Sequence, residues 1–168
     1  MKQVADSETS KILEIARECL DIPGDFVELG CYEGDTSILL AEILAHSDKR
    51  LWIYDSFEGL PEKSSEDFSE AGKNFRGGEL VVSKKYVKQR FLRANLPVPI
   101  IKKAWFNQLD PEKDVPKQIA FAFLDGDFYD SIKVSLELVA PKMGEKSVII
   151  VHDYDNPELP GVTKAVEE

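Results

Sequence analysis

The sequence predicts an α/β domain with a doubly wound, parallel, Rossmann-like sheet, and three observations support this fold class. Short apolar runs alternate along the chain with segments whose apolar residues recur at helical spacing. The first run leads through a glycine-containing turn, residues 30–34, into a helical segment. The run at residues 119–124 is apolar throughout, which is typical of a central strand covered on both faces. Strands that alternate with helices form βαβ units, whose crossovers make the sheet parallel.

Five strands are predicted from the apolar runs and from the residues that bound them. The first follows the breaker pair Pro23-Gly24, and the third is entered through Pro97 and Pro99. The predicted strands are residues 26–30, 51–55, 98–102, 119–124 and 147–151.

Helices are predicted where apolar residues lie three and four positions apart. The first belongs to an N-terminal segment, residues 1–22, which is expected to cover the sheet. Ser83 is expected to cap a later helix whose buried stripe is Tyr86, Val87, Phe91 and Leu92. The predicted helices are residues 6–20, 35–45, 83–95, a segment around 132–139 and a last one that begins near residue 162.

The longest stretch without a regular pattern is residues 56–82, which contain Gly59, Pro61 and the pair Gly77-Gly78. Loops of this length inside a compact domain are usually lids or disordered insertions. Because this loop follows directly after the acidic end of the second strand, we expect a lid over bound substrate.

Composition predicts one domain over residues 1–168, long enough for one sizeable core. The formal net charge of −10 argues against a nucleic-acid partner, since phosphate contacts need a basic face. The N-terminus is polar and no apolar run has membrane-spanning length, so we expect no membrane partner and a cytoplasmic location. Cys19 and Cys31 have no neighbouring Cys or His at metal spacing and are expected to be reduced, structural thiols.

Polar groups follow four of the predicted strands: the turn at Gly30, Asp55, Asp125 and the pair His152-Asp153. The carboxyl ends of parallel strands lie at one edge of the sheet, which is where ligands bind. We therefore expect these groups to form one site.

The glycine turn reads Glu28-x-Gly30-x-x-x-Gly34, which differs from the G-x-G-x-x-G of NAD-binding folds. Its glycines permit close backbone approach, and free N–H groups at the start of the next helix attract an anion. Asp55 lies 21 residues beyond Gly34, where its carboxylate can accept both ribose hydroxyls of a nucleoside. The pattern favours a nucleoside site, and the alternative is a turn that serves packing alone.

Asp125, His152 and Asp153 are candidate ligands of one divalent cation, Mg²⁺ or Mn²⁺, because carboxylates and an imidazole converge there. The structural alternative is that Asp125 caps the following helix and Asp153 makes a loop turn. His152 is alternatively a general base, since the ordinary pKa of histidine lies near neutrality.

Four ordered motifs occupy most of residues 22–166: Gly24-Asp-Phe-Val-Glu-Leu-Gly with Gly34, Tyr54-Asp-Ser-Phe-Glu-Gly-Leu-Pro-Glu62, Leu124-Asp-Gly-Asp-x-Tyr-x-Ser131, and Val151-His-Asp-Tyr followed by Pro160-Gly-x-x-Lys-Ala-Val166. With these motifs the chain resembles class I S-adenosylmethionine-dependent methyltransferases, specifically the macrocin O-methyltransferase family. The resemblance implies O-methylation of a small-molecule hydroxyl, on a sugar or a glycosylated natural product, with S-adenosylmethionine as the donor and a divalent metal assisting.

The same resemblance implies roles for individual residues. Asp125 would ligate the metal and act as base, with His152 as the second catalytic group and Asp153 as a further ligand. Within the cofactor site, Glu28 and the glycines would hold the methionine part, Asp55 the ribose, and the Trp105-Phe106 region the adenine. The implied cofactor-binding residues are Glu28, Gly30, Tyr32, Gly34, Thr36, Ser37, Asp55, Ser56, Trp105, Phe106 and Asp125.

Two features depart from the family pattern. His152 stands where an aspartate is usual, so we expect a weaker preference for Mg²⁺ or a loss of metal binding. The chain also ends before the last strand pair expected of these methyltransferases, so we expect that pair to be missing, supplied by a partner as in a homo-oligomer, or truncated. The alternatives are a catechol-type or N-methylating small-molecule methyltransferase, and a module that binds S-adenosylmethionine without catalysis.

Overall fold

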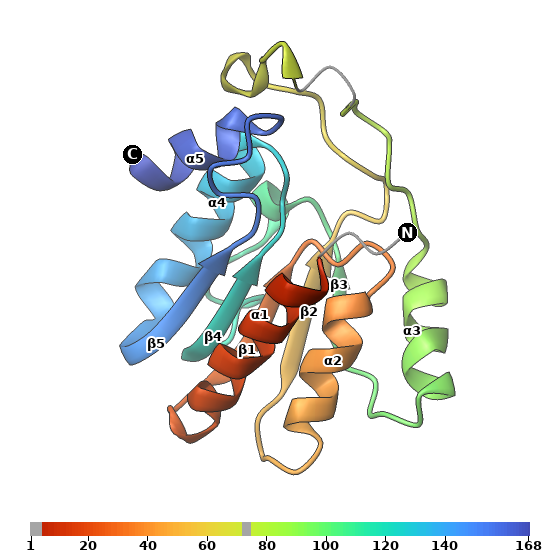
Figure 1. Cartoon of the computed structure of the whole chain (residues 1–168). Coiled ribbons are helices and arrows are strands. Elements are labelled where there is room, and N and C mark those ends of the chain that lie inside the picture. Colours follow the sequence, from red (N-terminus) through yellow and green to blue (C-terminus); the bar gives the residue numbers. More distant parts are fainter. Residues whose placement is uncertain (1–4, 72–74) are drawn as a thin grey trace.

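The computed structural model describes residues 5–71 and 75–168, and within them it contains an α/β sandwich (Figure 1). The strands are β1 (Asp25–Leu29), β2 (Leu51–Asp55), β3 (Ile100–Lys103), β4 (Ile119–Leu124) and β5 (Met143–Val151). The α-helices are α1 (Asp6–Glu18), α2 (Asp35–Leu44), α3 (Lys84–Arg93), α4 (Tyr129–Val139) and α5 (Pro160–Glu167). Short 3₁₀ turns are η1 (Cys19–Asp21), η2 (Ser65–Asp67), η4 (Phe106–Gln108) and η5 (Ala140–Lys142).

The strands form one sheet in the order β3-β2-β1-β4-β5, and all four neighbouring pairs are parallel. The chain therefore winds outward from β1 in both directions, which confirms the predicted doubly wound topology. The central position of β4 follows from its sequence, because every one of its residues is buried. β5 lies at one edge, and no further strand of the described residues pairs with it.

Two apolar cores cover the two faces of the sheet, because successive strand residues point to opposite sides. Phe26 and Phe121 pack with their rings 5.1 Å apart on the face that α1, α2 and α3 cover. Val27 and Leu124 belong to the opposite core, under α4 and α5. Figure 1 shows α1 and α2 in front of the strands and α4 and α5 on the other side. This sandwich leaves the carboxyl edge of the sheet open to ligands.

The prediction for α3 was half right. Ser83 caps it as expected, its hydroxyl accepting the Tyr86 N–H at 3.1 Å, and Val87 and Phe91 are buried. Tyr86 and Leu92 were wrongly placed in the stripe, since they are 39% and 66% exposed. Only Val87 and Phe91, which are four positions apart, pack into the core, so the buried stripe is narrower than predicted.

The loop between β2 and α3 crosses the carboxyl ends of the strands (Figure 1). In its described part, 56–71 and 75–82, regular structure is limited to η2. Its two limbs are joined by backbone hydrogen bonds, from Leu60 N–H to the Glu79 carbonyl and from Gly78 N–H to the Leu60 carbonyl, both 2.8 Å. These bonds hold the two limbs of the loop together, while its role as a lid stays a prediction.

None of the helices in the described residues combines the length and the apolar character that a membrane crossing requires.

Candidate active site

A cavity of about 400 Å³ opens at the carboxyl edge of the sheet, beneath the loop that follows β2. It brings together segments that lie far apart in the sequence: the glycine turn, the end of β2, the region after β3 and the turn after β4. The lining residues are Gly30, Tyr32, Asp55, Ser56, Gly59, Leu60, Pro61, Glu62, Leu80, Trp105, Phe106, Asn107, Gln108, Asp125, Gly126, Asp127, Asp130, Ser131 and Val134.

The glycine turn has the conformation that its glycines predict. Gly30 has a φ of 89°, and a Cβ atom at this position would lie 2.0 Å from the carbonyl oxygen of Asp125. Only glycine therefore allows the ends of β1 and β4 to approach so closely. Gly34 has a φ of 82° and precedes α2 as its N-cap.

Asp55 holds the glycine turn in place. Its Oδ2 accepts the N–H groups of Cys31 at 2.9 Å and Tyr32 at 3.2 Å, and its Oδ1 accepts the Phe57 N–H at 2.7 Å. Sequence reasoning predicted only the ribose role for Asp55. The carboxylate is placed to take it, since Asp55 lines the cavity, but it also fixes the turn beside which a ligand would bind.

Glu28 lies in β1 and is buried, with an exposed fraction of 1%. Its carboxyl accepts the hydroxyl of Ser37, which is itself fully buried in α2. Burial raises the pKa of Glu28 to about 8, and the Ser37 hydrogen bond offsets only part of this rise. Glu28 is therefore mainly uncharged at neutral pH and ties β1 to the start of α2.

Trp105 and Phe106 reach the cavity together with Ser56, as the resemblance implied. The neighbouring Asn107 and Gln108 add polar groups that sequence reasoning missed. No local pattern marks these two residues, because they contribute through the turn η4 rather than through a motif.

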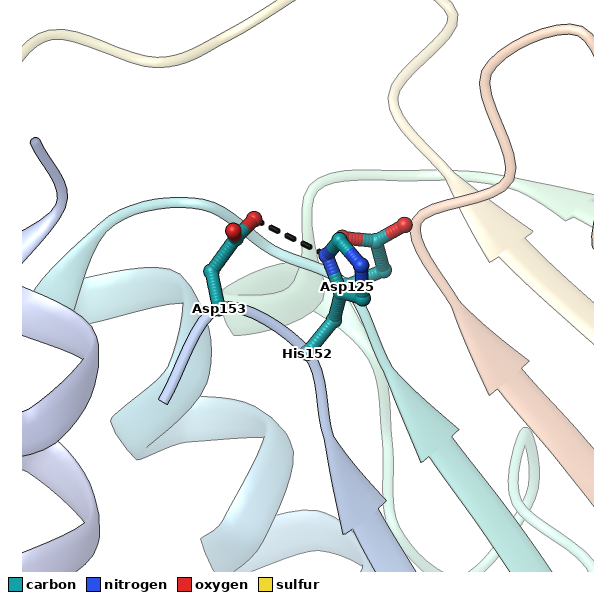
Figure 2. A group of neighbouring side chains, drawn as sticks. All are labelled: Asp125, His152 and Asp153. Atoms are coloured by element: carbon teal, nitrogen blue, oxygen red, sulfur yellow. Dashed lines mark hydrogen bonds and ion pairs between the residues drawn. The ribbon is translucent and has the colours of Figure 1, made fainter. Parts of the chain in front are cut away.

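Asp125, His152 and Asp153 meet at the ends of β4 and β5 (Figure 2). The Nδ1 atom of His152 lies 2.8 Å from Asp153 Oδ2 and 3.2 Å from Asp125 Oδ1. Burial of the imidazole opposes its charge, but both carboxylates favour it and together raise the pKa of His152 to about 11. Burial alone would raise the pKa of Asp153, yet hydrogen bonds from His152 and Asn156 bring it below its ordinary value.

These three side chains fit a divalent cation by their chemistry and their spacing. One ligand atom from each lies within 4.8 Å of the others, and they supply one nitrogen and two oxygens. Ligand atoms that coordinate one small six-coordinate cation lie about 3 Å apart. The Nδ1 atom of His152 lies at this separation from both carboxylate oxygens. In the absence of a cation the same spacing suits an imidazolium hydrogen-bonded to both acids. A proton and a cation would therefore compete for Nδ1.

Asp125 does not cap the following helix, so that alternative is wrong. The N-cap of α4 is Phe128, and the Tyr129 N–H donates to Asp67 of the β2–α3 loop at 2.7 Å. Asp153 does take part in a turn, with a φ of 58° and its carbonyl accepting the Asn156 N–H at 3.1 Å.

The predicted site residues divide into two groups in the structure. Those that line the cavity are Gly30, Tyr32, Asp55, Ser56, Trp105, Phe106 and Asp125. The others are not among the residues that line it: Glu28, Gly34, Thr36, Ser37, His152 and Asp153. Asp127 was missed by sequence reasoning; burial and the carboxylate of Asp125 raise its pKa well above the usual range. The ligand and catalytic roles of all these residues stay predictions.

The parallel sheet in this order, with its glycine turn and an aspartate at the end of β2, defines a class I methyltransferase fold. The chain belongs to the macrocin O-methyltransferase (TylF) family, whose model matches residues 7–168. This membership confirms the resemblance that the four motifs predicted.

Individual relatives agree with this assignment. The chain is 33% identical, over 79% of its length, to 8-demethyl-8-(2,3-dimethoxy-alpha-L-rhamnosyl)-tetracenomycin-C 4'-O-methyltransferase of Streptomyces olivaceus. It is 31% identical, over 86% of its length, to demethyldecarbamoylnovobiocin O-methyltransferase of Streptomyces niveus. The chain spans 54% and 60% of the lengths of these two relatives.

Among solved structures, the O-methyltransferase NovP superposes with a TM-score of 0.79 at 29% identity. The superposition covers 94% of this chain and 70% of that one. The calicheamicin methyltransferase CalS11 superposes with a TM-score of 0.81 at 21% identity, over 96% of this chain and 69% of that one, which shows the shared fold.

Proposed function

We propose that this protein transfers a methyl group from S-adenosylmethionine to a hydroxyl oxygen of a small molecule. The observation that carries the proposal is the single cavity that joins the glycine turn, Asp55 and Asp125 in a chain of this family. A nucleoside site and a proton acceptor on one cavity are the two parts that methyl transfer to oxygen requires.

The cavity suits a cationic ligand. Its lining includes the acidic residues Asp55, Glu62, Asp125 and Asp130, besides Asp127, whose raised pKa lowers its negative charge. S-adenosylmethionine carries a positive sulfonium, which such a lining attracts. Asp55 would accept the ribose hydroxyls, and Trp105 and Phe106 would border the adenine ring.

Asp125 would accept the proton of the acceptor hydroxyl. As the methyl group moves, the carbon–sulfur bond breaks, the new carbon–oxygen bond forms, and the hydroxyl proton goes to the carboxylate. Asp125 lines the cavity, whereas His152 and Asp153 lie beside it, which favours Asp125 over His152 as the base. Asp125, His152 and Asp153 would hold a divalent cation, Mg²⁺ or Mn²⁺, which when bound lowers the pKa of a nearby hydroxyl.

The acceptor would be a hydroxyl on a sugar or a glycosylated natural product. The relatives named above carry names that describe O-methylation of a rhamnosyl-tetracenomycin and of demethyldecarbamoylnovobiocin. Their similarity to this chain supports the same class of acceptor.

Calorimetric titration with S-adenosylmethionine, followed by turnover assays with glycosylated phenols, tests the proposal. We expect binding, and formation of S-adenosylhomocysteine together with an O-methylated product in mass spectrometry. Binding without turnover across a broad acceptor panel would support the alternative of a non-catalytic module. Failure to bind S-adenosylmethionine would overturn the proposal.

A further inference from the structure

Asp67 is a buried carboxylate in the β2–α3 loop, outside the cavity and outside every motif that the sequence analysis used. It ends the turn η2, and its exposed fraction is 1%. A carboxylate so deeply buried in a loop is expected to be fully hydrogen-bonded.

Both oxygens of Asp67 are engaged, on two different parts of the chain. Oδ2 accepts the N–H and the hydroxyl of Ser64, at 2.9 and 2.8 Å, and so closes the loop turn. Oδ1 accepts the N–H of Tyr129, the first residue of α4, at 2.7 Å. Phe128, the N-cap of α4, has no side-chain oxygen, so Asp67 supplies the cap that the helix lacks in its own sequence. A carboxylate at a helix N-terminus is also favoured by the helix dipole.

The carboxylate of Asp67 is tightly packed against the start of α5. A Cβ atom on Gly161, in the first turn of α5, would lie 1.9 Å from Asp67 Oδ1. Two flanking contacts also bind the loop near α5: Lys164 pairs with Glu66 at 3.2 Å, and the Ser69 hydroxyl donates to the Pro157 carbonyl at 3.0 Å. The loop turn is thus seated against α4 and α5.

The hydrogen bonds of Asp67 to Ser64 and Tyr129 connect two walls of the cavity. The loop before η2 carries Gly59, Leu60, Pro61 and Glu62, which line one side. The turn before α4 carries Asp125, Gly126 and Asp127, which line the other, and it leads directly into Tyr129. In that turn Asp127 has a φ of 60°, a left-handed conformation that aspartate tolerates better than most residues but that outside contacts still help to hold.

We propose that Asp67 is a positioning residue that couples the loop wall of the cavity to the Asp125 turn, so that both walls order together. It acts without touching the ligand. The inference rests on the proposed function only for its effect on cofactor affinity, because the coupling itself is a property of the free protein.

Amide hydrogen exchange, resolved by residue with NMR, tests the coupling. We compare Asp67→Ala and Asp67→Asn with the control Glu66→Gln, which removes the charge of the neighbouring surface ion pair with Lys164 and leaves the hydrogen bonds of Asp67 in place. In Asp67→Ala, exchange should accelerate roughly 10- to 100-fold at Ser64, at Tyr129 and in the 125–128 turn, as expected for loss of hydrogen bonds to a charged group. Asp67→Asn keeps one acceptor oxygen and should show a smaller effect at the same positions. Glu66→Gln should match the parent protein.

The binding readout is the dissociation constant of S-adenosylmethionine. We expect it to rise about tenfold in Asp67→Ala, the equivalent of one lost hydrogen bond to a charged group, and to stay within about twofold in Glu66→Gln. Faster exchange at Ser64 alone, with the 125–128 turn and the affinity unchanged, would overturn the proposal and leave Asp67 as a loop anchor. If Asp67→Ala does not fold, the Asp67→Asn data decide by the same criterion. If the parent protein does not bind S-adenosylmethionine, the proposed function fails, while the exchange data still decide the coupling.

Discussion

Glu28→Gln is expected to remove a pH dependence of folding stability that the buried carboxyl imposes. Burial raises the pKa of Glu28 from 4.5 to about 8 in the folded protein. Because the folded pKa lies above the unfolded one, the contribution of Glu28 to stability is complete below pH 4.5 and is lost as the pH rises to 8. At about 1.4 kcal/mol per pKa unit, the parent protein should lose about 3 kcal/mol by pH 7 and about 4 kcal/mol by pH 8, where the folded carboxyl is half ionised.

Urea denaturation between pH 4.5 and 8.5, followed by tryptophan fluorescence, measures this loss. The glutamine variant carries no ionisable group at position 28. The difference in unfolding free energy, variant minus parent, should therefore increase by these amounts as the pH rises. Glu42→Gln, on the exposed side of α2, is the matched control and should follow the parent curve. Parallel curves for the parent and Glu28→Gln across this range would refute the buried, uncharged carboxyl.

Three further predictions concern the site. Asp55→Ala should weaken S-adenosylmethionine binding at least about tenfold in calorimetry, because it removes hydrogen bonds to the glycine turn as well as a ribose contact; unchanged affinity would exclude both roles. Asp125→Asn should retain cofactor binding but lower the turnover rate by about 10²- to 10⁴-fold in a coupled S-adenosylhomocysteine assay, and full activity at saturating metal would exclude Asp125 as the base. His152→Asp should strengthen Mg²⁺ binding relative to Mn²⁺ in calorimetric titrations, since it converts the ligand set to oxygen alone; an unchanged Mg²⁺ to Mn²⁺ ratio would exclude His152 as a ligand.

The sequence predicted the elements best where local pattern and burial agree. The bounds of β2 and β4 match the prediction, because each is an apolar run that a polar residue ends abruptly. β5 begins at Met143 rather than at residue 147, because Met143 already pairs with Ile119 and the register then shifts across the exposed Glu145 and Lys146 before pairing resumes at Val148. Hydrophobic periodicity has no signal for such residues.

The site was predictable to the extent that its residues follow strands. Asp55, Asp125 and His152 were located from topology, because parallel strands deliver their carboxyl ends to one edge. Asp67 could not be found in this way, since it meets Tyr129 across 62 residues of sequence and no local motif marks a cap donated from a loop. The same holds for Gln108 and Asp130, which reach the cavity only through tertiary packing.

The glycine turn is preorganised by side chains on both sides of it. On the cavity side, Asp55 uses the N–H groups of Cys31 and Tyr32, so these two donors are already occupied before a ligand arrives. On the far side, the Arg90 guanidinium donates to the Glu33 carbonyl at 2.8 Å and to the Asp35 carboxylate at 2.6 Å. A turn held in this way loses little conformational entropy when a ligand binds, which is the advantage of preorganisation. The acidic side chain at the end of β2 therefore shapes the turn, and in the proposed function it would also present its remaining acceptor capacity to the ligand.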